Sequence, residues 1–220
     1  MSIRLSKWMV MPAAVLLLGG AALAQDTSSS GSSRQGSSAT TATPAKQPTI
    51  AERKENQQDR IANGVKSGQL TAGETANLES KEAAINGETR ADRAANGGKL
   101  TQSEKQQINQ QQNQLSKQIY QDKHNAKTAQ YGNNKVGERR ENQQDRIAEG
   151  IKSGQLTAGE TAKLENQQRG INQQVKADRS ANGGKLTAGE KQQINKEQNA
   201  ASKNIYNKKH NGKTQAGTKK

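Results

Sequence analysis

Apolar side chains recur along residues 50–212 at intervals of three, four and seven, as they do on one face of an α-helix. Ile61 and Val65 are one turn apart, and Leu78 and Ile85 are seven residues apart. No segment alternates apolar and polar residues in the manner of a β-strand. The pattern therefore predicts an all-α fold whose helices each carry a narrow apolar stripe.

Start and stop signals for these helices alternate along the chain. A Thr three residues before a Glu predicts a capping box, in which each residue's side chain accepts a hydrogen bond from the other's backbone N–H. Glycines stand where each of the first two helices of a copy would end in a left-handed turn: Gly68, Gly97, Gly98, Gly154, Gly183 and Gly184. The predicted capping boxes are Thr49 with Glu52, Thr71 with Glu74, Thr101 with Glu104, Thr157 with Glu160, and Thr187 with Glu190. Together these signals predict six helices, over residues 50–66, 72–95, 102–125, 137–152, 158–181 and 188–211.

The helical region is a duplication. Residues 52–130 align with residues 138–216 at a constant offset of 86, and 53 of these 79 positions are identical. Self-similarity at a fixed period indicates a repeat architecture. The sequence therefore predicts two tandem three-helix modules, residues 49–127 and 138–212, joined by a linker over residues 128–137.

The first 24 residues have the features of a secretory signal peptide. Arg4 and Lys7 precede an apolar run from Trp8 to Leu23, and the small residues Ala22 and Ala24 mark a cleavage site. A membrane anchor is the alternative, although the apolar run is short for a bilayer span of about 20 residues. We expect an exported protein, periplasmic or extracellular, with a disordered Ser/Thr-rich linker over residues 25–48 and a disordered basic tail over residues 213–220.

Composition changes this picture in two ways. The formal net charge is +14, or +12 once Arg4 and Lys7 are removed with the signal peptide, and a basic surface attracts anions as well as aiding solubility. After residue 24 the chain has 20 Ile, Leu and Val residues and no Phe, Trp or Met. So little apolar material predicts a fold of marginal stability, or one that a partner stabilises.

The loops before the capping boxes resemble degenerate EF-hands. Gly98, Leu100 and Glu104 fit positions 6, 8 and 12 of a calcium loop, but the earlier positions lack most of the oxygen ligands. A divalent-cation site, if any loop formed one, would use Glu149, Ser153 and Glu160. The chain has no cysteine and one histidine per module, which are too few ligands for a zinc site. We expect no cofactor.

Other functional motifs are scarce. The sequence has no GxSxG, HExxH or phosphate-binding GxxxxGK[ST] motif, and its carboxylates are expected on solvated faces where their pKa values are ordinary. Tyr120 and His124 share a helix face with the spacing that recurs at Tyr206 and His210, which suits either recognition or a favourable interaction with the helix dipole. Three tyrosines are too few for a base-stacking platform, so only non-specific polyanion binding is expected.

The Gly-x-Leu-Thr-x-x-Glu and Tyr-x-x-Lys-His-Asn segments resemble those of secreted bacterial repeat proteins across residues 50–212. That resemblance implies an exported repeat protein and brings no activity with it. The Leu-Thr-x-x-Glu motif is also similar, more weakly, to the Leu-Thr-x-x-Gln motif of periplasmic stress chaperones. These are helical cradles that hold unfolded clients without ATP.

The sequence thus favours a protein without enzymatic activity. The leading hypothesis is a structural or interaction role, in which basic helical faces dock an anionic polymer, the cell envelope surface or a partner protein. A protective, chaperone-like role under envelope stress is the first alternative. Weak, EF-hand-like binding of a divalent cation is the second.

Overall fold

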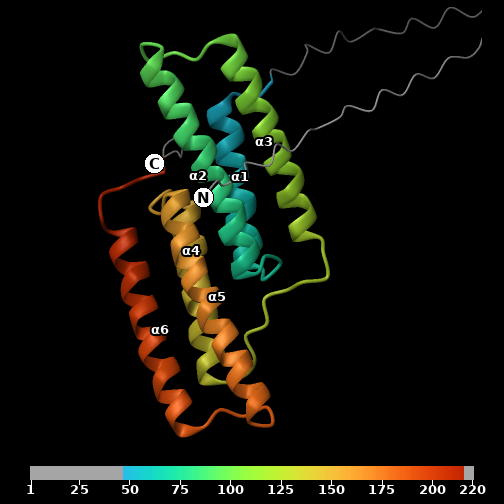
Figure 1. Ribbon diagram of the computed structural model, residues 1–220, viewed down its shortest axis with the longest axis vertical. Helices are drawn as coiled ribbons and strands as arrows, with labels where there is room; N and C mark the ends of the chain where they lie inside the picture. The colour runs from blue at the N-terminus through green and yellow to red at the C-terminus, as the bar shows by residue number, and fades with distance from the viewer. Residues whose placement is uncertain (1–46, 216–220) are drawn as a thin grey trace, which may run out of the picture. The chain divides into compact units, whose positions relative to one another are not determined.

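The computed structural model describes residues 47–215, and these residues form six α-helices and no strand (Figure 1). The helices are α1 (Ile50–Lys66), α2 (Ala72–Ala95), α3 (Gln102–Lys123), α4 (Lys135–Lys152), α5 (Ala158–Ala181) and α6 (Ala188–Lys209). The all-α class with three helices in each copy is confirmed. No helix within residues 47–215 is both long and apolar enough to cross a membrane. The predicted signal peptide, residues 25–46 of the linker and residues 216–220 of the tail lie outside the described residues.

Capping fixes where these helices begin. All five Thr–Glu pairs form capping boxes. At the start of α2, for example, the Glu74 amide donates to Thr71 Oγ1 over 3.3 Å and the Thr71 amide donates to Glu74 Oε2 over 3.0 Å. Helix α4 begins at Lys135, two residues before its predicted start, because Asn134 is its N-cap and accepts from the Gly137 amide over 3.2 Å.

The ends of α3 and α6 also differ from the prediction. Both helices end two residues early, because His124 and His210 occupy the C-cap positions. Each histidine Nδ1 lies 2.7 Å from the carbonyl oxygen of the tyrosine four residues before it. This contact closes the last turn with a side chain in place of further helical backbone.

The turn between α1 and α2 packs back on α1. The Leu70 amide donates to the Gly64 carbonyl over 3.0 Å, and a Cβ at Gly64 would lie 2.7 Å from Leu70 Cδ1. The second copy repeats this contact between Gly150 and Leu156, where the distance would be 2.6 Å. Real Cβ atoms do not approach a neighbour so closely, so an alanine at either position would force the buried Leu70 or Leu156 side chain to move.

The segment after α3 returns to this same turn, and it brings the two sequence motifs together. Asn125 Nδ2 donates to Glu74 Oε1 over 2.8 Å, and the Ala129 amide donates to the Gly68 carbonyl over 2.8 Å. In the second copy Asn211 donates to Glu160 over 2.5 Å. The asparagine of the Tyr-x-x-Lys-His-Asn motif therefore ties the end of the third helix to the capping box that begins the second.

The two copies pack against each other through α2 and α5, which form the most extensive helix contact in the described residues, and next through α1 and α4. Position Gly73, at the start of α2, faces Arg169 in the middle of α5, and Gly159, at the start of α5, faces Ala83 in the middle of α2. The first halves of α2 and α5 thus run antiparallel alongside each other. Their C-terminal halves extend in opposite directions, each with the third helix of its own copy (Figure 1).

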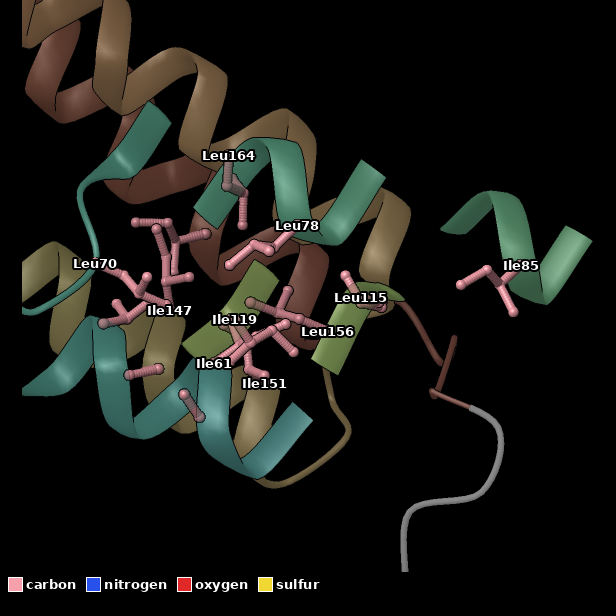
Figure 2. Packing of buried hydrophobic residues seen from close by; sticks show 14 of the residues in the cluster. Ile61, Leu70, Leu78, Ile85, Leu115, Ile119, Ile147, Ile151, Leu156 and Leu164 are labelled. Atoms are coloured by element: carbon pink, nitrogen blue, oxygen red, sulfur yellow. The ribbon is translucent and has the colours of Figure 1, made fainter. Parts of the chain in front are cut away.

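The largest hydrophobic cluster belongs to both copies. Figure 2 shows Ile61, Leu78 and Ile119 of the first copy beside Ile147 and Leu164 of the second. A smaller cluster, within the second copy alone, contains Val136, Ile171, Val175, Leu186, Ile194 and Ala201. Each copy therefore completes its core with side chains of the other.

The contact between Gly64 and Leu70 predicts that alanine destabilises the protein at position 64 but not at the uncrowded position 87. Gly64→Ala should lower the free energy of unfolding by about 1–3 kcal/mol, because the added methyl overpacks the turn. Gly87→Ala is the matched control inside α2, where a Cβ would meet nothing within 4 Å. It should raise stability by up to about 1 kcal/mol, because alanine favours the helix. Urea unfolding followed by circular dichroism measures both, and an equal effect of the two substitutions would contradict the close packing.

Candidate functional site

A group of buried polar side chains lies where the two copies meet, and we call it the polar seam. It consists of the buried residues Gln58, Glu79, Glu82, Gln144, Glu165 and Gln168. Gln58 Nε2 donates to Glu79 Oε2 over 3.2 Å, and the equivalent Gln144 Nε2 donates to Glu165 Oε2 over 2.9 Å. Each copy therefore forms the same amide–carboxyl pair between its own first and second helices, and Glu79 and Glu165 lie close enough across the copies to repel each other.

The expectation that the carboxylates lie on solvated faces is wrong for Glu79, Glu82 and Glu165, each of which has no exposed surface. Glu79 and Glu82 follow Leu78 by one and four residues, so they share the apolar face of α2 with Leu78 and Ile85. The spacing of Glu79 and Glu82 from Leu78 indicates that both lie on the buried face of the helix. Their charge suggests the opposite, because charged residues are seldom buried without an ionic partner.

Burial raises the pKa of all three carboxyls, since it disfavours the charged form. Desolvation raises the pKa of Glu165 to about 8, against one stabilising hydrogen bond from Gln144. It raises the pKa of Glu82 to about 7, although nearby Lys54 opposes the shift. It raises the pKa of Glu79 well above its usual range, and repulsion from Glu82 and Glu165 adds to the effect.

The hydrogen bonds of the seam also favour protonated carboxyls. The buried atoms of the seam that have no partner are all oxygens: Gln58 Oε1, Glu79 Oε1, both carboxyl oxygens of Glu82, Glu165 Oε1 and Gln168 Oε1. A carboxylate adds further acceptors to this set, whereas a carboxylic acid adds one donor. Protonation therefore supplies the kind of atom that the seam lacks.

The seam predicts that stability falls as the pH rises. The folded-state pKa values exceed the reference value of 4.5, so the stabilisation is complete below about pH 4.5 and is lost as the pH rises through about 7 for Glu82 and about 8 for Glu165. Across that window the free energy of unfolding should fall by about 1.4 kcal/mol per pH unit for each carboxyl. Urea unfolding at a series of pH values measures the slope.

Glu165→Gln tests the assignment, because glutamine keeps the shape and removes the titration. Between pH 5 and 8, the free energy of unfolding of the variant should fall less steeply with pH than that of the wild type, by the contribution of one carboxyl. Above pH 8 the variant should be more stable than the wild type. Glu82→Gln should behave in the same way around pH 7, and Gln168 already occupies this position in the second copy. If the free energy of unfolding of both variants depended on pH as steeply as that of the wild type, these carboxyls would not titrate as buried groups.

The residues proposed for a divalent cation have other partners. Glu149 Oε2 lies 3.6 Å from Lys209 Nζ, and Ser153 Oγ contacts Gln155 Oε1 at 3.1 Å. The Glu160 carboxyl accepts from the Thr157 amide and from Asn211. Within residues 47–215 no group of three or more histidine, aspartate or glutamate residues is arranged to hold a metal ion. The loops thus use their oxygen atoms to cap helices and to close turns.

The tyrosine–histidine pairs form one small exposed feature in each copy. The rings of Tyr120 and His124 stack with centroids 4.2 Å apart, and the rings of Tyr206 and His210 repeat this distance. Because each histidine Nδ1 faces a carbonyl oxygen, Nδ1 carries a proton. Both tyrosines remain more than half exposed, at 60% and 57%.

In each copy, a basic side chain of the first helix lies near basic side chains from the end of the second helix, and others follow in the next turn and at the start of the third helix. We call these groups basic tract 1, which contains Lys54, Arg90, Arg93, Lys99 and Lys105, and basic tract 2, which contains Arg140, Lys176, Arg179, Lys185 and Lys191. Each position of one tract is the 86-residue equivalent of a position in the other. Residues 81–90 and 167–176 share only two identical positions, yet the positive charge at Arg90 and Lys176 is retained.

Most of these cations lack an acidic partner. The ion pairs within residues 47–215 are Lys127 with Glu74 and Lys209 with Glu149, and neither involves a tract residue. Burial lowers the pKa of Lys54, with attraction from Glu82 opposing the shift and repulsion from Arg90 and Arg93 adding to it. Like charges therefore lie close together in tract 1 without a neutralising carboxylate for each.

Arg140 is the exception in tract 2. Its side chain is buried, its Nη2 donates to the Gln130 carbonyl over 3.2 Å, and its guanidinium carbon lies 5.5 Å from the centre of the Tyr131 ring. Through these two contacts the Arg140 guanidinium binds the segment between α3 and α4, which joins the two copies. The other four cations of tract 2 remain at the surface.

Each tract borders a recess with an apolar floor. End recess 1 has a volume of about 590 Å³ and is lined by Ile50 and Leu100 together with Arg93, Lys99 and Lys105. End recess 2 has a volume of about 660 Å³; its apolar residues are Val136 and Leu186, and its cations are Lys135, Arg139, Arg179, Lys185 and Lys191. Neither lining contains a carboxylate. Of the acidic residues at these turns, Glu104 and Glu190 accept hydrogen bonds within their own capping boxes.

The sequence predicted basic helical faces in general, but it did not identify the tracts or the recesses. The signal that could have found them is the retention of Lys or Arg at the same five positions of both copies. No family model matches the chain, and neither does any curated protein or solved structure. The functional assignment therefore rests on the seam, the tracts and the recesses.

Proposed function

We propose that this protein is an exported, non-enzymatic interaction protein that docks on an anionic polymer or surface through its two basic tracts. The observation that carries the proposal is the pair of equivalent cation clusters whose exposed members have no carboxylate partner. A cation that is not neutralised within the protein attracts an external anion most strongly.

The electrostatics of tract 1 support this function. Burial is the main cause of the lowered pKa of Lys54; attraction from Glu82 opposes the shift, and repulsion from Arg90 and Arg93 adds to it. An anion bound among them would relieve that repulsion and would gain attraction from each cation. Because the cations are mostly exposed, salt would screen the interaction over about 10 Å at 0.1 M.

The buried carboxyls support a structural role in preference to a catalytic one. Glu79, Glu82 and Glu165 have raised pKa values, which are often found at active sites. Here the same three side chains have no exposed surface, so a substrate does not reach them in this structure. The polar seam is therefore assigned to the contact between the copies, and binding is assigned to the surface tracts.

The charge of the tracts predicts retention on a heparin column at physiological ionic strength. Replacing both Lys99 and Lys185 with glutamine should move elution to a clearly lower salt concentration. For a polyanion in solution, each lost contact should lower the slope of log affinity against log salt by about one.

Lys117 and Lys203 provide the matched control. They are exposed, they are equivalent positions of the two copies, and they lie outside the tracts on α3 and α6. Replacing both with glutamine removes the same formal charge and should shift elution much less. Equal shifts for the two double variants would show that net charge, and not the tracts, governs binding. Passage of the wild type through the column at low salt would refute the proposed function itself.

A further inference from the structure

The end recesses combine two kinds of surface that a hydrophilic polymer would not use together. Ile50 and Leu100 form the apolar floor of end recess 1, and Val136 and Leu186 form that of end recess 2. Val136 and Leu186 are 8% and 9% exposed, so the hydrophobic core of the second copy reaches the surface there.

A phosphate or sulfate on a polysaccharide would satisfy the cations at the rim and would leave the apolar floor in contact with water. An anionic lipid matches both parts, because its charged headgroup meets the cations while the first methylene groups of its alkyl chain cover the floor. Burial of each methylene group contributes to affinity in proportion to its apolar area. The lysine side chains of the rim suit this chemistry, since their aliphatic stems cover apolar surface while their amino groups remain in water.

The arrangement of the helices places the two recesses at opposite ends. Gly73 faces Arg169 and Gly159 faces Ala83, so the C-terminal halves of α2 and α5 point away from each other. End recess 1 adjoins the α2–α3 turn and end recess 2 adjoins the α5–α6 turn. Figure 1 shows these two turns at opposite ends of the helical unit. At about 1.5 Å per residue, the C-terminal ends of α2 and α5 are separated by roughly 50 Å.

We propose that each end recess binds the headgroup and the upper alkyl chain of an anionic lipid, so that one chain bridges two lipid surfaces. The inference rests on the proposed function and names its ligand. End recess 2 is the stronger site, because five cations line it and three line end recess 1.

Vesicles of phosphatidylcholine with phosphatidylglycerol test the proposal. Co-sedimentation reports binding, and dynamic light scattering reports clustering. The wild type should bind these vesicles and cluster them, and it should do neither with vesicles of phosphatidylcholine alone. The first single-end variant carries Arg93→Gln with Lys99→Gln, and the second carries Arg179→Gln with Lys185→Gln. Each should still bind but should no longer cluster the vesicles, and the second should lose more affinity.

Two further variants separate lipid binding from attraction of charge alone. Ile50→Thr and Val136→Thr remove apolar surface from the floors while they keep a β-branched side chain. Together they should weaken vesicle binding by about fivefold, corresponding to about one buried methyl contact, with heparin elution unchanged. Circular dichroism melts confirm that the variants are folded.

Calorimetry with octyl phosphate and ethyl phosphate provides a version of the test without mutations. Octyl phosphate should bind at two sites per chain and clearly more tightly than ethyl phosphate. Equal binding of the two phosphates, or clustering by both single-end variants, would overturn the inference. Retention on heparin without binding to vesicles would also overturn it, while the docking of an anionic polymer would stand. Loss of both would remove the proposed function as well.

Discussion

The antiparallel contact between α2 and α5 is the constraint on which the rest of the structure depends. The chain has 20 Ile, Leu and Val residues after residue 24, and no Phe, Trp or Met there to enlarge its core. Neither copy has enough apolar surface for a large core of its own, so the main cluster combines side chains from both. Duplication is therefore a condition for a stable core as well as a means of presenting two surfaces.

The polar seam places buried carboxyls of both copies at this contact. Each copy forms the same amide–carboxyl hydrogen bond within itself, Gln58 with Glu79 and Gln144 with Glu165. Glu79 and Glu165 repel each other across the copies, so protonation of these carboxyls favours the contact. The seam also distinguishes the copies, because Glu82 of the first corresponds to Gln168 of the second. Gln168 donates to Gln143 over 3.0 Å, a hydrogen bond that a carboxylate could not donate.

Local features of the fold could be predicted from the sequence, and long-range features could not. The predicted capping boxes mark the starts of five helices correctly, because the two residues of each box hydrogen-bond to each other within a single turn, as Thr71 and Glu74 do. The start of α4 was missed, since Asn134 caps it without a matching Glu. The spacing of Glu79 and Glu82 after Leu78 indicated the buried face, but their charge suggested solvent. No short stretch of the sequence predicts that α2 and α5 pack antiparallel, because this packing depends on which face each copy buries against the other.

The same antiparallel order determines where the two basic tracts lie on the molecule. Were α2 and α5 parallel, the α2–α3 and α5–α6 turns would lie at one end, and both tracts would meet a single surface. In the antiparallel order the overlapping first halves build the shared core, and the C-terminal halves present the tracts at opposite ends. Each element thus serves two purposes along its length. The half of α2 that carries Leu78 and Glu79 packs in the shared core, and the half that carries Arg90 and Arg93 presents exposed cations near the α2–α3 turn.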